Sequence, residues 1–172
     1  ELASRDVGKL DDVYIGCKDE IKAYQVKDVK GNLTFFKFFY SDTESIFQGC
    51  FRGWKFLKMN YPKQVINAKY ISNEIPSKND KIDSFDGSIK PSFSDFRENF
   101  WNYIKKSNSE NIIPIGWENV FEEIKSIVNS NKEELFDFIK SFEFVLDNDY
   151  DVSKNISKNN FQRIKDIDKI SK

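Results

Sequence analysis

Acidic, amide and lysine side chains stand near one another in the first part of the sequence. Asp11 and Asp12 introduce a short run of alternating apolar and polar residues, and Gln25 and Lys27 end a second such run after the polar segment 18–20. Two short alternating runs separated by a polar turn are typical of a β-hairpin. The sequence therefore predicts that these side chains lie on two paired strands.

The register of this hairpin decides which side chains meet. A turn centred on residues 19–20 places Asp12 opposite Lys27 and Tyr14 opposite Gln25. Residues two apart on a strand share a face. In this register a carboxylate, an amide and a lysine therefore converge on one patch of the hairpin.

A turn centred half a residue earlier brings Asp11 opposite Lys27 instead, and the sequence leaves both registers open. In either register the chemistry suits a metal site, because carboxylate and amide oxygens are ligands that Mg²⁺ accepts, with water completing its shell. Bound metal lowers the pKa of water and stabilises charge on a phosphate. A nearby lysine can orient that water or neutralise the developing charge. The alternative interpretation is a hairpin with ordinary surface charges.

The order acidic residue, spacer, acidic residue or glutamine, one further residue and lysine resembles the pattern of PD-(D/E)XK nucleases. Over most of its length the chain also resembles the nuclease-like N-terminal domain of bacterial NACHT or other STAND-type NTPases linked to anti-phage defence. The motifs that carry the resemblance are Glu1-Leu-Ala, Gly8-Lys-Leu-Asp-Asp-Val13, Ala23-Tyr-Gln-Val-Lys27, Phe51-Arg-Gly-Trp-Lys-Phe-Leu57, Tyr70-Ile-Ser-Asn-Glu-Ile-Pro-Ser77, Phe96-Arg-Glu-Asn-Phe-Trp101 and the segment 138–146.

The resemblance implies a restriction-endonuclease-like α/β fold, a mixed sheet with flanking helices, that acts on double-stranded DNA with Mg²⁺ or Mn²⁺. It implies that Asp12 is the main metal ligand, with Asp11 as its neighbour. It implies that Glu1 is the acidic residue of the first strand and that Lys27 is the catalytic lysine. Gln25 would occupy a position where many relatives have an acidic residue. The glutamine removes one negative charge, so we expect weaker metal binding unless Glu1 contributes.

The composition excludes several other chemistries. The chain has 172 residues, no histidine and a formal net charge of −1. Without histidine, Ser-His-Asp and Cys-His catalysis and histidine-ligated zinc are excluded. Cys17 and Cys50 are too few for a disulfide scaffold and suggest reduced thiols of a cytoplasmic protein. No apolar run is long enough to span a membrane, so we expect no membrane partner. The start at Glu1 suggests a segment of a longer protein.

The elements expected to position the site lie in the first half of the chain. Alternation predicts strands over 12–17 and 21–27, and a continuous aromatic run suggests a third strand over 33–40, with the start of a buried helix as the alternative. Helical spacing of apolar residues predicts a helix over 46–57. The run 65–71 then predicts a strand parallel to one of the first, because a helix intervenes.

The second half of the chain reads as helical. Apolar stripes at helical spacing cover 93–104, 117–128 and 135–145. We therefore expect a nuclease-like α/β core over 1–92 and a helical C-terminal half over 93–172, which belongs to the same domain and links it to a downstream module.

A long polar loop is expected over 72–92, between the two halves. Asn73 and Glu74 directly follow the strand that precedes this loop. They either bring polar groups near the site or simply end the strand.

Charge is distributed unevenly along the chain. Between residues 21 and 72 nine basic residues face three acidic ones, whereas from 133 to 151 seven acidic residues face one base. A basic zone beside the predicted site suits a DNA backbone. We expect Arg52 and Lys55 on the helix, and Lys30, to contact phosphates. The alternative is a set of solvated lysines.

Together these features predict a metal-dependent DNA endonuclease that serves as the effector domain of a larger anti-phage defence protein. Its partners would be double-stranded DNA and a downstream NTPase and sensor module of the same polypeptide. Activation would involve a homo-oligomer in which paired sites cut both strands. The first alternative is a catalytically degenerate domain of the same fold that serves in docking or recognition. A lower-ranked alternative is an immunity or inhibitor protein.

Overall fold

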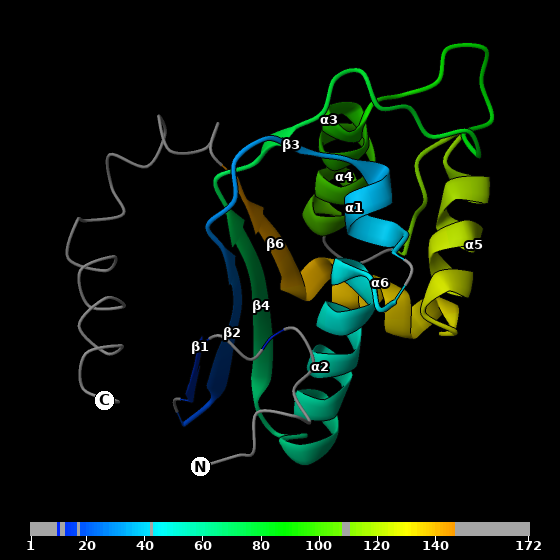
Figure 1. Ribbon diagram of the computed structural model, residues 1–172. Coiled ribbons are helices and arrows are strands. Elements are labelled where there is room, and N and C mark those ends of the chain that lie inside the picture. The colour runs from blue at the N-terminus through cyan, green and yellow to red at the C-terminus, as the bar shows by residue number, and fades with distance from the viewer. Residues whose placement is uncertain (1–9, 11–12, 17, 42, 108–110, 147–172) are drawn as a thin grey trace.

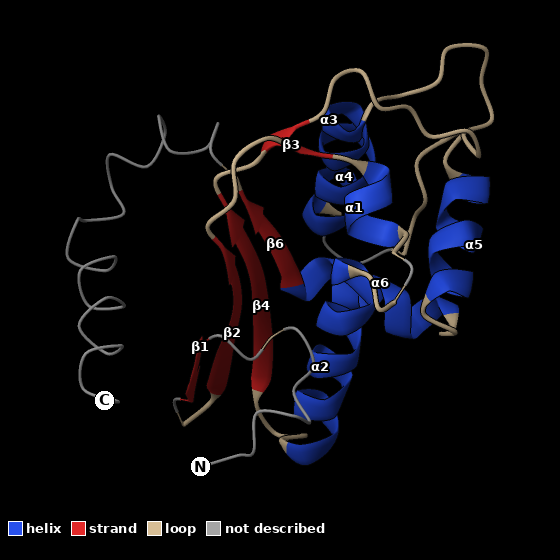
Figure 2. Cartoon of the chain, in the orientation of Figure 1, coloured by secondary structure: helices blue, strands red, loops and turns tan. Residues whose placement is uncertain are grey.

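A mixed sheet organises the part of the chain that the computed structural model describes. It describes residues 10, 13–16, 18–41, 43–107 and 111–146. Its main sheet has four strands, which are β1 (Val13–Gly16), β2 (Glu20–Lys27), β4 (Val65–Ser72) and β6 (Phe142–Val145). They lie in the order β1-β2-β4-β6, with β1 antiparallel to β2 and the other neighbours parallel. The expected α/β class with a mixed sheet is confirmed (Figure 1, Figure 2).

The register of the first hairpin differs from the expected one. Tyr14 pairs with Ala23 and not with Gln25. The ladder closes with the pair Gly16 and Ile21, so the centre of the turn lies one residue earlier than expected. Glu20 starts β2 and pairs with Val65 of β4. There the carboxylate of Glu20 accepts a hydrogen bond of 2.7 Å from Nδ2 of Asn67 on β4. This hydrogen bond holds the acidic side chain against the neighbouring strand β4.

The aromatic run after β2 forms a short buried helix, which is the alternative that the sequence left open, and not the strand that was expected first. Only β3 (Asn32–Leu33) is extended, and it pairs with β5 (Ile75–Pro76) in a small parallel sheet. Helix α1 (Phe35–Phe39) follows, and the side chain of Thr34 caps it by accepting a hydrogen bond from the amide of Lys37. The helical conformation buries three of the phenylalanines on one face, and these are Phe35, Phe38 and Phe39.

Helix α2 (Ile46–Asn60) connects the first strands to β4, as predicted. Its start is a capping box in which the Ser45 hydroxyl and the Gln48 side chain bond to each other's backbone amides at 3.1 and 3.0 Å. Its end is Tyr61, directly before a proline that cannot continue a helix. The crossover through α1 and α2 is what makes β2 and β4 parallel.

The second half of the chain contains the remaining helices. A continuous helical segment comprises α3 (Phe93–Phe96), the π-helical turn η1 (Arg97–Trp101) and α4 (Asn102–Lys106). It is followed by α5 (Glu118–Ile127) and α6 (Lys132–Ser141). The helices predicted from the three apolar stripes are present, although the third is shorter than expected.

The third helix was predicted to continue to residue 145, but the chain becomes extended at Phe142 and forms β6. Two side chains from η1 and α4 stabilise the extended backbone at Phe142. Nζ of Lys105 and Nε1 of Trp101 donate hydrogen bonds of 2.7 and 3.4 Å to the carbonyl oxygen of Phe142. The expectation that everything after residue 93 is helical is therefore wrong for this strand, which pairs with β4.

The core lies between the sheet and the helices, which occupy the same side of the sheet in Figure 1. Phe38 of α1 packs on Tyr70 of β4 and Phe144 of β6, with ring centroids 6.0 and 5.0 Å apart. Trp101 packs on Phe142 at 5.6 Å. None of the described helices has both the length and the apolar character that crossing a membrane requires.

Candidate functional site

Gln25 and Lys27 occupy the carboxyl end of β2. Gln25 shares the side of the sheet that carries the buried Ile21 and Ala23 and is itself only 2% exposed, and Lys27, two residues on, follows the same alternation and is exposed. In the parallel register Gln25 is the partner of Tyr70, and Lys27 that of Ser72. Side chains from the ends of two neighbouring strands therefore meet at one edge of the sheet.

Glu74 is the buried carboxylate of this region, at 2% exposure. Its Oε2 accepts hydrogen bonds from the hydroxyls of Tyr70 and Ser72 at 2.8 and 3.1 Å. Its Oε1 accepts one from Nζ of Lys37 on α1 at 3.2 Å. Of the two possibilities weighed from the sequence, a simple strand end and a polar group near the site, the structure supports the second for Glu74.

A pocket of about 520 Å³ opens beside these residues. We call it the lysine pocket, because three lysines from three different elements line it: Lys27 of β2, Lys30 of the following loop and Lys37 of α1. Glu74 is the acidic residue of its wall. The lysine pocket therefore carries a net positive charge and suits an anionic ligand.

The fold neutralises most of the basic zone that the sequence shows. Six of the nine basic residues between 21 and 72 form ion pairs, which are Lys22–Glu20, Lys37–Glu74, Arg52–Glu44, Lys55–Glu134, Lys58–Asp137 and Lys69–Glu143. The last three partners come from the acidic segment after residue 133. Lys27, Lys30 and Lys63 have no ion-pair partner among the described residues. Two of these three cations line the lysine pocket.

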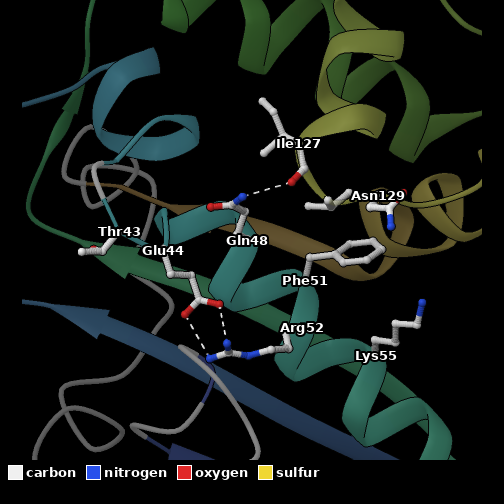
Figure 3. Close-up of a pocket in the computed structure, with 9 residues that line it drawn as sticks. Thr43, Glu44, Gln48, Phe51, Arg52, Lys55, Ile127 and Asn129 are labelled. Carbon is white, nitrogen blue, oxygen red and sulfur yellow. Dashed lines mark hydrogen bonds and ion pairs between the residues drawn. The ribbon is translucent and has the colours of Figure 1, made fainter.

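Arg52 and Lys55 lie in a different place from the lysine pocket. They line a second pocket of about 480 Å³ between α2 and the end of α5. Figure 3 shows Arg52 turned toward Glu44, which it contacts through two ion-pair distances of 2.8 and 3.0 Å. Exposed pairs of this kind contribute about 0–1 kcal/mol, so a phosphate can displace the carboxylate at small cost.

The expected metal ligands Glu1, Asp11 and Asp12 lie outside the described residues. Within the ranges that are described, no three carboxylate or thiol side chains gather as a metal site. Gln25 and Glu74 nevertheless bring oxygens of the kind that Mg²⁺ accepts to the same end of the sheet. Oε1 of Glu74 accepts a single hydrogen bond from the described residues and retains a lone pair. Of the two, only Glu74 lines the lysine pocket, so a divalent cation bound there would take most of its ligands from elsewhere.

Two tyrosines near the lysine pocket are held in the neutral form. Burial raises the pKa of Tyr70 well above its ordinary value, and its hydrogen bond to Glu74 adds to the shift. Burial likewise raises the pKa of Tyr40, whose hydroxyl donates to Glu123. Both hydroxyls therefore act as hydrogen-bond donors and not as bases at neutral pH.

Sequence reasoning gave Glu74 no role in the site and left open whether it simply ends the strand. The signal available in the sequence was its position two residues after a strand, at an edge where parallel strands end. Its contact with Lys37, which is 37 positions away in the chain, depends on α1 being a helix.

The geometry thus defines an α/β protein with a cationic pocket at the carboxyl edge of β2 and β4. The chain matches no protein-family model, and it has no significant match among curated proteins or solved structures.

Proposed function

We propose that this chain is a metal-dependent DNA endonuclease domain with a restriction-endonuclease-like core. One observation carries the proposal. The two cations Lys27 and Lys30, unpaired among the described residues, line a pocket at the strand ends together with the buried Glu74, and Gln25 lies two residues before Lys27 on β2. Cations, a hard-ligand set and a cavity at one edge of a sheet are the parts that phosphodiester hydrolysis requires.

The roles follow from the position of each residue. Gln25, together with Asp12 or Asp11 and with Glu1, would hold Mg²⁺ or Mn²⁺. The bound ion would lower the pKa of a water molecule and neutralise charge on the phosphate. Lys27 projects from the strand end into solvent, where its ammonium group can stabilise the negative charge that develops on the phosphate. Lys30 is placed to contact a neighbouring phosphate.

The biological setting that we propose is the effector position in a larger anti-phage defence protein. A downstream NTPase and sensor module would bring copies of the domain together, and paired sites would then cut both strands of double-stranded DNA. Arg52 and Lys55 lie in a pocket separate from Lys27, so we assign them to more distant phosphates of the same duplex.

The test compares Lys27→Ala with Lys22→Ala. Both lysines belong to β2. Lys22 lies near the hairpin turn, three residues before Gln25 and on the other side of the strand, and it pairs with Glu20 at 3.3 Å. We expect Lys27→Ala to slow Mg²⁺-dependent nicking of supercoiled plasmid by about 100-fold or more. Lys22→Ala should retain the parent rate. Equal rates for Lys27→Ala and the parent would refute the assignment of Lys27.

A specific observation also favours the second candidate, a degenerate domain used in docking. Gln25 is neutral, and both oxygens of Glu74 already accept hydrogen bonds. Titration with Mn²⁺, followed by electron paramagnetic resonance, separates the two. A folded chain that binds neither Mn²⁺ nor DNA supports docking, whereas Mn²⁺ binding that Gln25→Ala weakens supports the nuclease.

A further inference from the structure

Phe36 is an exposed aromatic residue beside the lysine pocket. The side chain is 63% exposed, although the three other phenylalanines of α1 are at most 3% exposed. It also lines the lysine pocket, next to Lys37 on the same helix. Burial in the core accounts for its neighbours, whereas Phe36 keeps most of its apolar surface in contact with water.

The charge around Phe36 indicates what it contacts. Lys27 and Lys30 line the same pocket, are exposed, and have no ion-pair partner among the described residues. A flat apolar ring beside cations that no described carboxylate pairs with is complementary to a ligand that combines an aromatic face with phosphates. Nucleic acids offer both when a base is unstacked, and sites for unpaired strands combine aromatic platforms with cations.

The platform is held in place by the same contacts that hold the site. Nζ of Lys37 donates to Oε1 of Glu74 at 3.2 Å and to the carbonyl oxygen of Asn32 at 2.9 Å. Helix α1 is thereby tied to the carboxyl end of β4. Phe36, one residue earlier, is presented from a helix whose position the buried carboxylate fixes.

The size of the lysine pocket indicates how much of a nucleic acid enters it. Its volume of about 520 Å³ lies within the range of about 300–1,000 Å³ for pockets that hold drug-sized molecules. A single nucleotide is of that size, whereas a base pair within a stacked duplex cannot enter. A nucleotide must therefore leave the stack to fill the pocket.

We propose that Phe36 stacks on an unpaired base of the bound DNA while Lys30 contacts the adjacent phosphate, so that within double-stranded DNA the site takes a locally unpaired stretch in preference to a fully paired one. This inference rests on the proposed nuclease function and specifies its substrate.

The test measures binding and cleavage separately. Fluorescence anisotropy with EDTA present compares three labelled DNAs of equal length, which are a single strand, a duplex with a central bubble and a fully paired duplex. The variants are Phe36→Ala, Phe36→Leu and Phe36→Trp. The matched control is Tyr103→Ala, since Tyr103 is an aromatic residue of α4 that is 47% exposed and does not line the pocket.

We expect the parent to bind the single strand and the bubble more tightly than the paired duplex. Phe36→Ala should weaken binding to both unpaired DNAs by about 5- to 150-fold, the effect of losing one stacked base. Phe36→Leu should resemble Phe36→Ala, whereas Phe36→Trp and Tyr103→Ala should bind like the parent.

Affinities of Phe36→Ala within twofold of the parent, or tightest binding to the paired duplex, would overturn the stacking proposal. Mg²⁺-dependent cleavage by the parent in the same preparation would then show that the nuclease assignment stands without it. A parent chain that neither binds nor cuts any of the three DNAs would overturn both.

Discussion

Replacement of Glu74 by alanine tests the polar network at the end of β4 most directly. The substitution removes the acceptor of the Tyr70 and Ser72 hydroxyls, which belong to residues that are 0% and 1% exposed. A buried donor left without a partner costs about 1–3 kcal/mol. Two such donors set an upper range of about 2–6 kcal/mol, and water entering from the adjacent pocket lowers it. We expect a loss of about 2–4 kcal/mol in the free energy of unfolding.

Double-mutant analysis separates this network from a general loss of packing. Tyr70→Phe alone should cost about 1.5–3 kcal/mol, since it removes a hydrogen bond to a charged group. In the Glu74→Ala background the same change should cost almost nothing, because the Tyr70 hydroxyl has already lost its partner. The coupling energy between the two sites should therefore reach at least about 1 kcal/mol.

The assay is urea unfolding followed by the fluorescence of the buried Trp54, Trp101 and Trp117. If the free energy of unfolding falls with urea concentration at the same slope in each variant, the variants expose the same amount of surface on unfolding. Glu143→Ala is the control, because this carboxylate is 48% exposed and forms a surface ion pair, worth about 0–1 kcal/mol, with Lys69. A loss below about 0.5 kcal/mol for Glu74→Ala, or additive effects with Tyr70→Phe, would refute the reasoning.

Three further outcomes follow from the fold. Trp101→Ala, at a fully buried position, should cost about 3–5 kcal/mol in urea unfolding. Ser45→Ala should lower the free energy of unfolding by about 1 kcal/mol, because the capping box with Gln48 is lost. A Ser45→Ala variant as stable as the parent would show that this cap does not stabilise α2. The hydrogen bonds from Ser92 lower the pKa of Asp95, so the folded state releases this proton more readily than the unfolded state. This contribution to stability is present above about pH 3.9 and is lost as the pH falls through the lower folded pKa. Asp95→Asn should therefore lose less stability than the parent between pH 5 and pH 2, measured by urea midpoints.

Long periodic segments made much of the fold predictable. Helix α2 and strand β4 were predicted because each keeps one spacing of buried residues over most of its length. For the run that forms α1, the sequence could not distinguish a strand from a helix, since consecutive phenylalanines satisfy the period of both. Strand β6 was missed because Phe142 lies three residues after Ile139 and so continues the helical stripe of α6.

For the predicted site, the structure describes Gln25 and Lys27 but not Glu1, Asp11 or Asp12. Gln25 and Lys27 share a face because alternation on a strand is local. The predicted hairpin register was wrong, since Tyr14 pairs with Ala23, because the polar segment 18–20 does not show at which residues the ladder closes. The pairing of Lys55 with Glu134 likewise joins segments that are far apart, so a basic stretch in the sequence does not become a basic surface.

Strand β6 has a consequence for any shortening of this chain. A fragment that ends at residue 92 contains β1, β2 and β4 but lacks the strand that pairs with residues 68–71 of β4. The backbone amides and carbonyls along that side of β4 would then be open to another chain, as would the face of Phe38 that packs on Phe144. Unpaired strand edges with apolar neighbours promote self-association. Such a fragment is therefore expected to aggregate. In the longer chain, residues 93–146 supply the strand that covers this edge of β4.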